Sequence, residues 1–409
     1  MVTENQTEKQ SITNNPLITN PEFLSYYRRV QRRAFLLEGG RAALGLGALS
    51  LSACSRTPAA PKDPFLESHV AAWEAGIPKW LQETKMPAVS IAIVRDGRLE
   101  WRRAFGVKDT GTNEPVDTDT LFAACSDTKP VFAYGVLKLC ERGVLNLDTP
   151  LTKYTRRRIT KDARIELITT RHVLSHTTGF PNWRQGNDLP IQFTPGSQYQ
   201  YSGEGFGYLQ SVVGEITGQS FERFMLDNVL TPLGMTSSGV SSNAESDRRI
   251  AKPHDENGKR FPDKDPPSAE KIAEDMARYG AAAALLTTPT DYATFLLEFV
   301  NPKPADDFRL NEASRREMLR PQIKRKNDWE GLAWALEEHP GTSLLFTHSG
   351  SAPGWYCFTA GSTERRSGLM VMLNGDSYVP FLMKMLASPS GPSSPAETLW
   401  PDFAKRFFA

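Results

Sequence analysis

The stretch that decides the fold is "CSDTKPVFAYGVLKLC", residues 125–140, which places Ser126 three residues before Lys129 at the start of a largely apolar run. Residues i and i+3 share one face of a helix, so the lysine amine would lie over the serine hydroxyl. A serine hydroxyl needs a base beside it to act as a nucleophile, and a buried lysine releases its proton easily enough to be that base. The spacing therefore predicts a reactive serine at the entrance of a buried helix that ends near Gly143.

The same Ser-x-x-Lys spacing occurs a second time, at Ser268 and Lys271, so the spacing alone is weak evidence. Ser268 follows "DKDPP" and precedes a polar helical pattern, with Gly280 expected beyond the helix end. A serine in that position is typical of a helix N-cap. We interpret Ser268 as a cap and Lys271 as a solvated helix residue, which leaves Ser126 as the candidate nucleophile.

The composition is that of a globular protein. The 409 residues are 39% hydrophobic and carry a formal net charge of +1, which argues against a nucleic-acid-binding protein. No spacing typical of a metal site is present, and neither a phosphate-binding glycine loop nor a Rossmann fingerprint occurs, so no metal and no cofactor are expected. A Gly-x-Ser-x-Gly elbow is also missing, which disfavours an α/β-hydrolase.

The sequence pattern of residues 1–66 is not typical of a folded domain. Residues 1–31 are polar and aperiodic, and we expect a disordered tail. Residues 32–54 begin with two arginines, continue with a short apolar run and end in "LSAC", which resembles a twin-arginine export signal followed by a lipobox at Cys54. These features predict export to the periplasmic or extracytoplasmic side and a lipid anchor on Cys54, the alternative being a poorly ordered helix. Residues 55–66, rich in Pro and Ala, would form a linker.

The other cysteines are Cys125, Cys140 and Cys357. Cys125 and Cys140 flank one predicted helix and would lie roughly 22 Å apart, beyond the reach of a disulfide. We expect three small, buried, unpaired side chains rather than a disulfide framework.

Strand patterns occur at both ends of the remaining chain. Residues 88–106 contain two strand-like runs around Asp96-Gly97, a strong signal for a type I′ hairpin. Further strand patterns lie at 343–350, 354–361 and 367–375, followed by helical patterns near 378–387 and 398–408.

A mostly helical region, about 121–289, separates the early hairpin from the late strands. Residues 67–409 are therefore predicted to form an α/β (α+β) domain with a central antiparallel sheet contributed by both chain ends, flanked by helices and carrying an inserted helical subdomain. The junction of sheet and subdomain is the expected place for a ligand cleft.

Several motifs occur in an order that resembles the serine β-lactamase and penicillin-binding protein superfamily, and most closely its branch of class C β-lactamases, DD-peptidases and esterases. They are "DTLFAACSDTKP" (119–130), "ITTRHVLSHTTGFP" (168–181), "PGSQYQYSGEGFG" (195–207) and "LFTHSGSAPGW" (345–355). The resemblance covers roughly residues 67–385. It implies a β-lactamase/transpeptidase-like fold and acyl transfer to water through a serine.

The resemblance assigns roles by position. Ser126 matches the family nucleophile, and Lys129 matches its proton-accepting partner. Tyr201 matches the tyrosine of the second motif, whose phenol would pass a proton between these two groups and the leaving group. Which of Lys129 and Tyr201 takes the first proton stays open.

The third motif is His348-Ser349-Gly350, which would lie on the strand edging the cleft. The resemblance implies an oxyanion hole made by the backbone N–H groups of Ser126 and Ser351. Gly203, Ser349 and Gly350 would help to bind the substrate.

Two positions depart from the pattern of the branch. Gly203 stands where an asparagine usually holds the acyl-amide side chain of a β-lactam, and His348 replaces a lysine that many lactamases place near the substrate carboxylate. Both changes favour a less anionic substrate. Asp127 is expected to take no part, Glu204 to be a charge on the cleft rim, and His176 to be structural.

The sequence thus predicts an exported serine hydrolase that acts on a small ester or amide. One alternative is a D-amino-acid peptidase or DD-carboxypeptidase acting on cell-wall peptides. The other is a non-catalytic penicillin-binding lipoprotein that acylates without turnover. The expected partners are a small-molecule ester, amide or peptidoglycan-derived peptide and, through the lipid, a membrane.

Overall fold

The computed structural model describes residues 64–386 except 187, 242, 263–267 and 338–343. The predicted tail, the predicted signal with Cys54, most of the predicted linker and the helical pattern near 398–408 lie outside the described residues. The chain divides into two units after Glu67, and everything below concerns the second unit. Helix α3 (Pro64–Thr84) begins before the end of the predicted linker.

The predicted hairpin is confirmed in the strands β1 (Ala88–Arg95) and β2 (Arg98–Asp109). The turn residues Asp96 and Gly97 both have positive φ, +50° and +70°, as a type I′ turn requires. Aspartate and glycine are among the residues that tolerate this backbone, which is why so short a signal fixed the turn.

Within the described residues, the main sheet has nine strands in the order β3-β2-β1-β11-β10-β9-β8-β7-β6, and all neighbours pair antiparallel. The early strand β1 pairs with the last strand β11, which confirms the prediction that both chain ends build the sheet. Strands β6 to β8 extend it further and were not predicted, because two or three residues are too few to show an alternating pattern. The remaining bounds are β3 Glu114–Pro115, β6 Ile323–Lys324, β7 Trp329–Glu330, β8 Ala335–Glu337, β9 Leu345–Ala352, β10 Trp355–Ser362 and β11 Ser367–Leu373.

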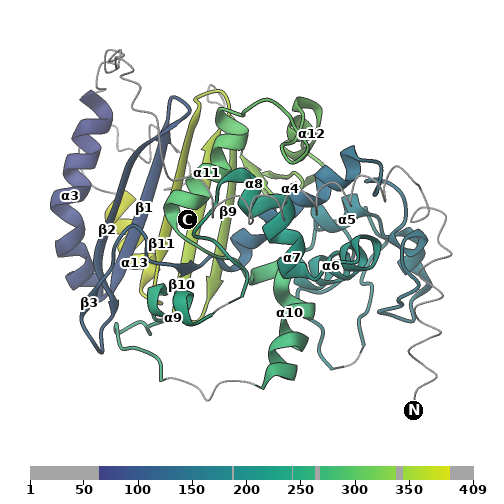
Figure 1. The fold of residues 1–409 in the computed structure, drawn as a ribbon, viewed down its shortest axis with the longest axis horizontal. Helices are drawn as coiled ribbons and strands as arrows, with labels where there is room; N and C mark the ends of the chain where they lie inside the picture. Colours follow the sequence, from purple (N-terminus) through teal and green to yellow (C-terminus); the bar gives the residue numbers. More distant parts are fainter. Residues whose placement is uncertain (1–63, 187, 242, 263–267, 338–343, 387–409) are drawn as a thin grey trace, which may run out of the picture. The chain divides into compact units, whose positions relative to one another are not determined.

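Helices cover both faces of this sheet (Figure 1). Successive strand residues point to opposite faces. On β2, Trp101 packs against Trp73 of α3, with ring centroids 6.2 Å apart, and the neighbouring Arg102 hydrogen bonds to Thr290 of α11 (Pro289–Val300). Helix α13 (Tyr378–Leu386) lies on the α3 side, since the Trp73 indole donates to the carbonyl of Met385.

The helical region lies beside the β9 half of the sheet and encloses helix α4 (Thr128–Glu141), whose residues 128–139 are all buried. Phe132 of α4 packs against Phe206, Phe221 and Phe224 from two neighbouring helices. The other elements of this part are β4 Phe122–Ala123, η2 Cys125–Asp127, η3 Leu151–Lys153, η4 Ala163–Leu167, α5 Thr170–Leu174, α6 Gly203–Thr217, α7 Phe221–Met225, η5 Leu226–Leu230, α8 Thr231–Leu233, α9 Ala244–Arg249, α10 Ala269–Ala283, β5 Leu286–Thr287 and, further along the chain, α12 Glu312–Met318.

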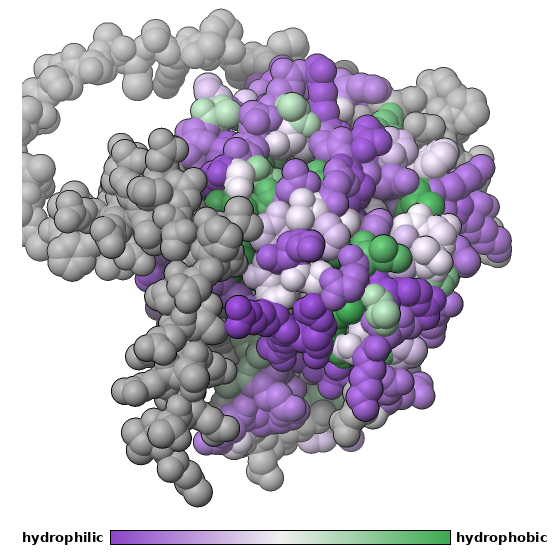
Figure 2. Space-filling view, turned by 90° about the vertical axis from the view of Figure 1, so that its right-hand side faces the viewer, coloured by the Kyte–Doolittle hydropathy of each residue, from purple (hydrophilic) through white to green (hydrophobic). Residues whose placement is uncertain are grey.

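The surface shown in Figure 2 is mostly hydrophilic, with hydrophobic residues in small separate groups. Within the described part of the chain, no helix is both long and apolar enough to cross a bilayer. The thiols of Cys125, Cys140 and Cys357 are all free, as predicted. Cys140 is only half-buried, however, because it lies near the exposed end of α4.

Candidate active site

Ser126 lies on the 3-10 turn η2, directly before α4, and lines a cavity of about 600 Å³. The preceding residue, Cys125, has φ +47°, a sparsely populated region for a non-glycine residue. Strand β9 crosses close to this turn, because Gly350 has no side chain. A Cβ on Gly350 would stand 2.3 Å from the carbonyl oxygen of Ala124 and 2.7 Å from the amide nitrogen of Ser126. The backbone of β9 that leads into Ser351 therefore lies against the nucleophile turn.

Lys129 is fully buried, and its amine is directed at the candidate nucleophile. Its Nζ donates to Ser126 Oγ over 3.1 Å and to the carbonyl of Ala282 over 2.7 Å. Burial lowers the pKa of Lys129 from 10.5 to about 7, and the nearby Asp127 works against this shift. An amine with such a pKa is partly neutral at physiological pH and can accept a proton.

Tyr201 completes the predicted trio. The Nζ of Lys129 lies 4.9 Å from the centroid of the Tyr201 ring. Burial raises the pKa of the Tyr201 phenol, and a hydrogen bond with Ser126 acts in the opposite direction. The structure thus brings Ser126, Lys129 and Tyr201 together, although they come from η2, α4 and the segment before α6.

His176 packs against the ring of Tyr201. Its ring lies against the Tyr201 ring, with centroids 4.3 Å apart, and its Nδ1 accepts the N–H of Ser202 over 3.1 Å. Burial lowers the pKa of His176 well below its usual value, so the ring is neutral. This geometry agrees with the structural role expected for His176.

His348 lies on β9 and faces a carboxylate that sequence reasoning left without a role. Its Nδ1 is 3.0 Å from Oδ1 of Asp127, which is fully buried and whose Oδ2 accepts from Thr359 over 3.2 Å. Asp127 lies directly after the nucleophile and 221 residues before His348. The signal that could have found this pair is an acid inside the Ser-x-x-Lys motif of a chain that has histidine in place of the third-motif lysine.

The cavity is lined by Ser126, Tyr201, His348, Ser349 and Ser351, together with Trp183, Tyr199, Arg325, Glu330, Tyr356 and Val379. Gly203 and Gly350 are not among its lining residues. Arg325 is bound by Asp328 at 3.0 Å and Glu330 at 3.1 Å, and its guanidinium lies 5.1 Å from the Tyr199 ring centroid. The positive charge of this guanidinium is therefore offset by two carboxylates.

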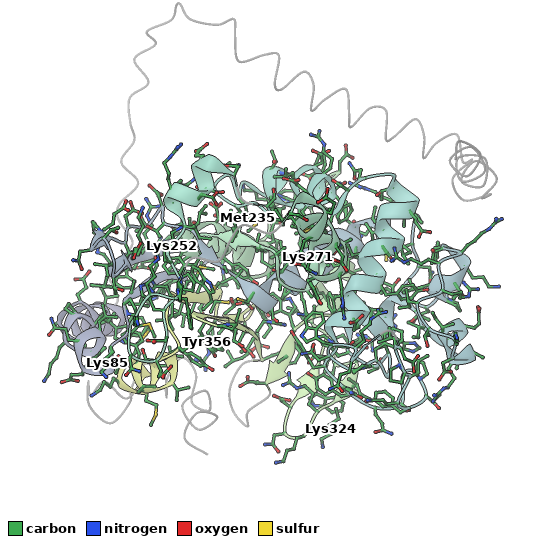
Figure 3. The ribbon with its side chains drawn as sticks, turned by 90° about the horizontal axis from the view of Figure 1, so that it is seen from below. Lys85, Met235, Lys252, Lys271, Lys324 and Tyr356 are labelled. Atoms are coloured by element: carbon green, nitrogen blue, oxygen red, sulfur yellow. The ribbon has the colours of Figure 1, made fainter. Side chains whose placement is uncertain are left out.

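The second Ser/Lys pair is a helix cap, as predicted. Ser268 Oγ accepts the N–H of Lys271 over 3.2 Å, and the Lys271 amine forms ion pairs with Glu274 and Asp275 on its own helix. Lys271 is not among the residues that line the cavity, and Figure 3 labels it separately from the lining residue Tyr356. The expectation that the helix ends before Gly280 was wrong.

Helix α10 continues through Gly280 to Ala283, because this glycine permits close packing against Phe221 and Gln210. A Cβ at Gly280 would stand 2.7 Å from the Phe221 ring and 2.8 Å from the Gln210 side-chain oxygen. The extra turn matters to the site, since it supplies the carbonyl of Ala282 that holds Lys129.

Glu204 is not a rim charge. Its side chain is 2% exposed and is held by the guanidinium groups of Arg184 and Arg278. Two cationic partners make burial of this carboxylate possible. In the residues that the structure describes, no group of three or more His, Cys, Asp or Glu side chains is placed to hold a metal ion.

Comparison with known proteins identifies the family of the chain. The family model described as Beta-lactamase matches residues 69–385. Esterase EstB of Burkholderia gladioli is 33% identical over 207 residues, which cover 43% of this chain and 52% of EstB. Protein flp of Staphylococcus aureus (strain MRSA252) is 23% identical over 329 residues, or 75% of this chain and 63% of flp. The matches thus span about half and less than two thirds of these relatives' own lengths.

Among solved structures, the D-alanine carboxypeptidase AmpC from Burkholderia cenocepacia superimposes with a TM-score of 0.66 at 18% identity, covering 79% of this chain and 100% of that one. At this identity the likeness shows the fold, which is that of β-lactamases and transpeptidases. With the family match over residues 69–385, it leads to one conclusion: the chain belongs to the β-lactamase family.

Proposed function

We propose that the protein is a serine hydrolase that forms an acyl-enzyme at Ser126 and hydrolyses small, uncharged esters. The observation that carries this proposal is the buried amine of Lys129, 3.1 Å from the hydroxyl of a serine that lines a cavity of about 600 Å³. A nucleophile with a base at hydrogen-bond distance and access to a substrate-sized space is the arrangement that acyl transfer requires.

The protonation states indicate the order of proton transfers. Burial lowers the pKa of Lys129 to about 7 but raises that of Tyr201, so at neutral pH the lysine can be a free amine while the tyrosine keeps its proton. Lys129 is therefore the first proton acceptor. As Ser126 Oγ bonds to the acyl carbon, its proton passes to the amine, and the Tyr201 phenol relays a proton to the departing alkoxide. The ester bond breaks, and the released alcohol leaves the acyl group on Ser126.

The second half of the reaction repeats these steps with water. Water attacks the acyl carbon, gives a proton to Lys129, and the carboxylic acid leaves as Ser126 Oγ recovers its proton. The N–H groups of Ser126 and Ser351, which family likeness assigns to the oxyanion hole, would stabilise the negative oxygen in both halves. Each such donor contributes about 3 kcal/mol in comparable enzymes.

The charges around the cavity support an uncharged substrate. Arg325 is paired with Asp328 and Glu330, and the imidazole Nδ1 of His348 lies 3.0 Å from Oδ1 of Asp127. A substrate carboxylate would find the guanidinium of Arg325 already paired with two carboxylates and the His348 ring already next to a third. The relative EstB is named an esterase, which is consistent with such a substrate.

A substrate panel tests the proposal. We expect rapid release of p-nitrophenol from p-nitrophenyl acetate, and kcat/KM at least about a hundredfold lower for a D-alanyl-D-alanine peptide and a chromogenic cephalosporin. Mass spectrometry of acid-quenched samples should find the acetyl group on the peptide that contains Ser126. Dominant release of D-alanine would make the protein a peptidase instead. A lasting β-lactam adduct without turnover of any substrate would make it a non-catalytic penicillin-binding protein.

Export and lipid anchoring are a second part of the proposal, supported by the twin arginines and the "LSAC" sequence at Cys54. We expect the full-length protein in the membrane fraction of a bacterial host and Cys54→Ser in the soluble fraction, because the thiol is the attachment point of the lipid. Ser126→Ala is the matched control and should remain with the membranes. Membrane attachment that survives Cys54→Ser would rule out this anchor.

A further inference from the structure

Trp183 occupies the space beside Gly203, the position where the branch usually has asparagine. A Cβ on Gly203 would stand 2.2 to 2.6 Å from three carbons of the six-membered ring of Trp183. The indole in its present place and a side chain at position 203 therefore exclude each other. Trp183 also lines the cavity that contains Ser126, and 38% of it is exposed.

The segment before Trp183 is fixed to the start of α6. The carbonyl of Asn182 accepts the N–H groups of Gly203 and Glu204 over 3.1 and 3.0 Å, and Asn182 Oδ1 accepts that of Gly203 over 2.9 Å. The hydroxyl of Ser202 donates to the carbonyl of Pro181 over 2.9 Å. These bonds leave the chain little freedom on the N-terminal side of the indole.

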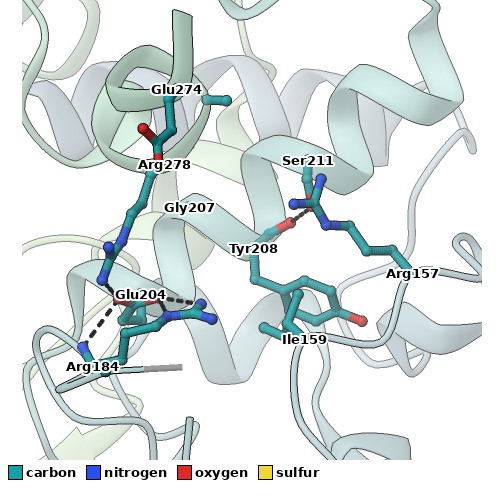
Figure 4. A pocket seen from close by; sticks show the side chains of 11 residues that line it. Arg157, Ile159, Arg184, Glu204, Gly207, Tyr208, Ser211, Glu274 and Arg278 are labelled. Atoms are coloured by element: carbon teal, nitrogen blue, oxygen red, sulfur yellow. Dashed lines mark hydrogen bonds and ion pairs between the residues drawn. The ribbon is translucent and has the colours of Figure 1, made fainter. Parts of the chain in front are cut away.

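The segment after Trp183 is fixed by the buried carboxylate of Glu204, which lies between two guanidinium groups (Figure 4). Glu204 accepts the backbone N–H of Arg184 over 3.1 Å and its Nε over 2.8 Å, and it accepts Nη2 of Arg278 over 2.9 Å. Trp183 thus stands between two anchored neighbours. Glu204 is a positioning residue for the indole.

Aromatic packing sets the orientation of the indole. The ring of Tyr279, on α10, meets it edge to face, with centroids 5.0 Å apart and planes at 81°. With Gly203 on one side and Tyr279 on another, the remaining indole surface is turned toward solvent and the cavity. An amide at position 203 would offer two donors and an acceptor, whereas the indole offers a flat apolar face.

We propose that Trp183 forms the wall of the acyl-group site and selects esters of flat, apolar acids, such as arylacetic acids, over acyl groups that carry a side-chain amide. This inference rests on the proposed function of Ser126. It adds the substrate class: the acid part of the ester packs against the indole, in the space where the branch holds the amide of a β-lactam side chain.

The test compares kcat/KM for p-nitrophenyl phenylacetate with that for p-nitrophenyl acetate. The wild-type protein should prefer the phenylacetate, and Trp183→Ala should lower this preference about tenfold, since it removes an aromatic contact and its apolar area. Trp183→Phe should give an intermediate ratio. The control is Leu167→Ala, a residue 48% exposed that does not line the cavity, and it should leave the ratio unchanged.

Gly203→Ala tests the contact between residue 203 and the indole of Trp183 by changing the residue on the α6 side of it. Its methyl group should push the indole out of place without removing any residue, and the ratio should fall in the same direction. If wild-type protein hydrolyses the acetate through Ser126 but neither Trp183→Ala nor Gly203→Ala changes the ratio, the proposed wall is wrong while the hydrolase proposal stands.

A binding experiment separates the two proposals if turnover fails. The two esters are titrated calorimetrically into Ser126→Ala protein, with and without Trp183→Ala. Tighter binding of the phenylacetate that depends on Trp183 supports the wall even if the wild-type protein turns over neither ester. If the two esters bind with equal affinity in both proteins, the proposed role of Trp183 is wrong, whether or not the wild-type protein is catalytically active.

Discussion

Ser126→Ala should lower kcat/KM for p-nitrophenyl acetate by more than about a thousandfold, the range observed when a serine hydrolase loses its nucleophile. No acyl-enzyme can form without Oγ. The fold should persist, because Ser126 is only half-buried and the Lys129 amine keeps its 2.7 Å bond to the carbonyl of Ala282. Esterase assays and thermal unfolding of the same preparation measure both expectations.

Ser268→Ala is a matched control, since it changes the serine of the same four-residue pattern elsewhere in the chain. It removes the cap of α10 and should cost about 1 kcal/mol in the free energy of unfolding while leaving kcat/KM unchanged. Ser126→Ala should thus lose activity and keep its stability, whereas Ser268→Ala should lose stability and keep its activity. Full turnover in Ser126→Ala would assign the nucleophile to another residue.

Lys129→Met should also lower kcat/KM by at least about a thousandfold, because the thioether has similar bulk and cannot accept a proton. It should change the dependence of stability on pH as well. The pKa of Lys129 is about 7 in the folded protein, below its ordinary value of 10.5, so between these values the unfolded chain binds the extra proton. The free energy of unfolding of the wild-type protein therefore rises with pH across this window.

Below about pH 7 both states carry the proton, and the cost of burying an ammonium group is fully present. Denaturant titrations at pH 6 and pH 9.5 measure this effect. Between the two pH values, the free energy of unfolding of the wild-type protein should increase relative to that of Lys129→Met by an amount on the order of a few kcal/mol. Lys271→Met changes an exposed amine and should leave the pH dependence of the free energy of unfolding the same as in the wild-type protein. A stability difference that is constant over this range would mean that the folded-state pKa is unshifted.

The activity of the wild-type protein should follow the same titration. As the pH falls below about 7, kcat/KM for the acetate ester should decline, because protonation of Lys129 removes the base. Titration of kcat/KM between pH 5 and 9 measures this limb. A midpoint two or more units away from 7 would assign the first proton transfer to a different group.

Residues whose signals are local were predicted well from the sequence. The Asp96-Gly97 turn and the Ser126/Lys129 spacing depend on neighbours within a few positions, so their geometry follows from the hairpin and helix periods. The strand patterns at both chain ends predicted one sheet built from both ends, and the pairing of β1 with β11 confirms this. These elements place the nucleophile and the sheet beside it.

Contacts between residues far apart in the sequence could not be predicted. Asp127 lies beside His348 because Gly350 lets β9 approach η2. A glycine in the sequence does not indicate which segment will pack against it. Trp183 lies in a segment with neither helical nor strand period, so nothing indicated that it would cover Gly203. Charge alone suggested a solvated Glu204, whereas the arginines that pair with it come from the loop before α6 and from α10.

The pairing of the first long strand with the last has a consequence during synthesis. Strand β9, which borders Ser126 and carries His348, begins 219 residues after that serine, and it is connected to β1 in the sheet only through β10 and β11. A nascent chain still on the ribosome with all of its helical region complete would lack one wall of the cleft. If the proposed function holds, ester hydrolysis can begin only after β11 has been synthesised, and products truncated before β9 should be inert toward esters.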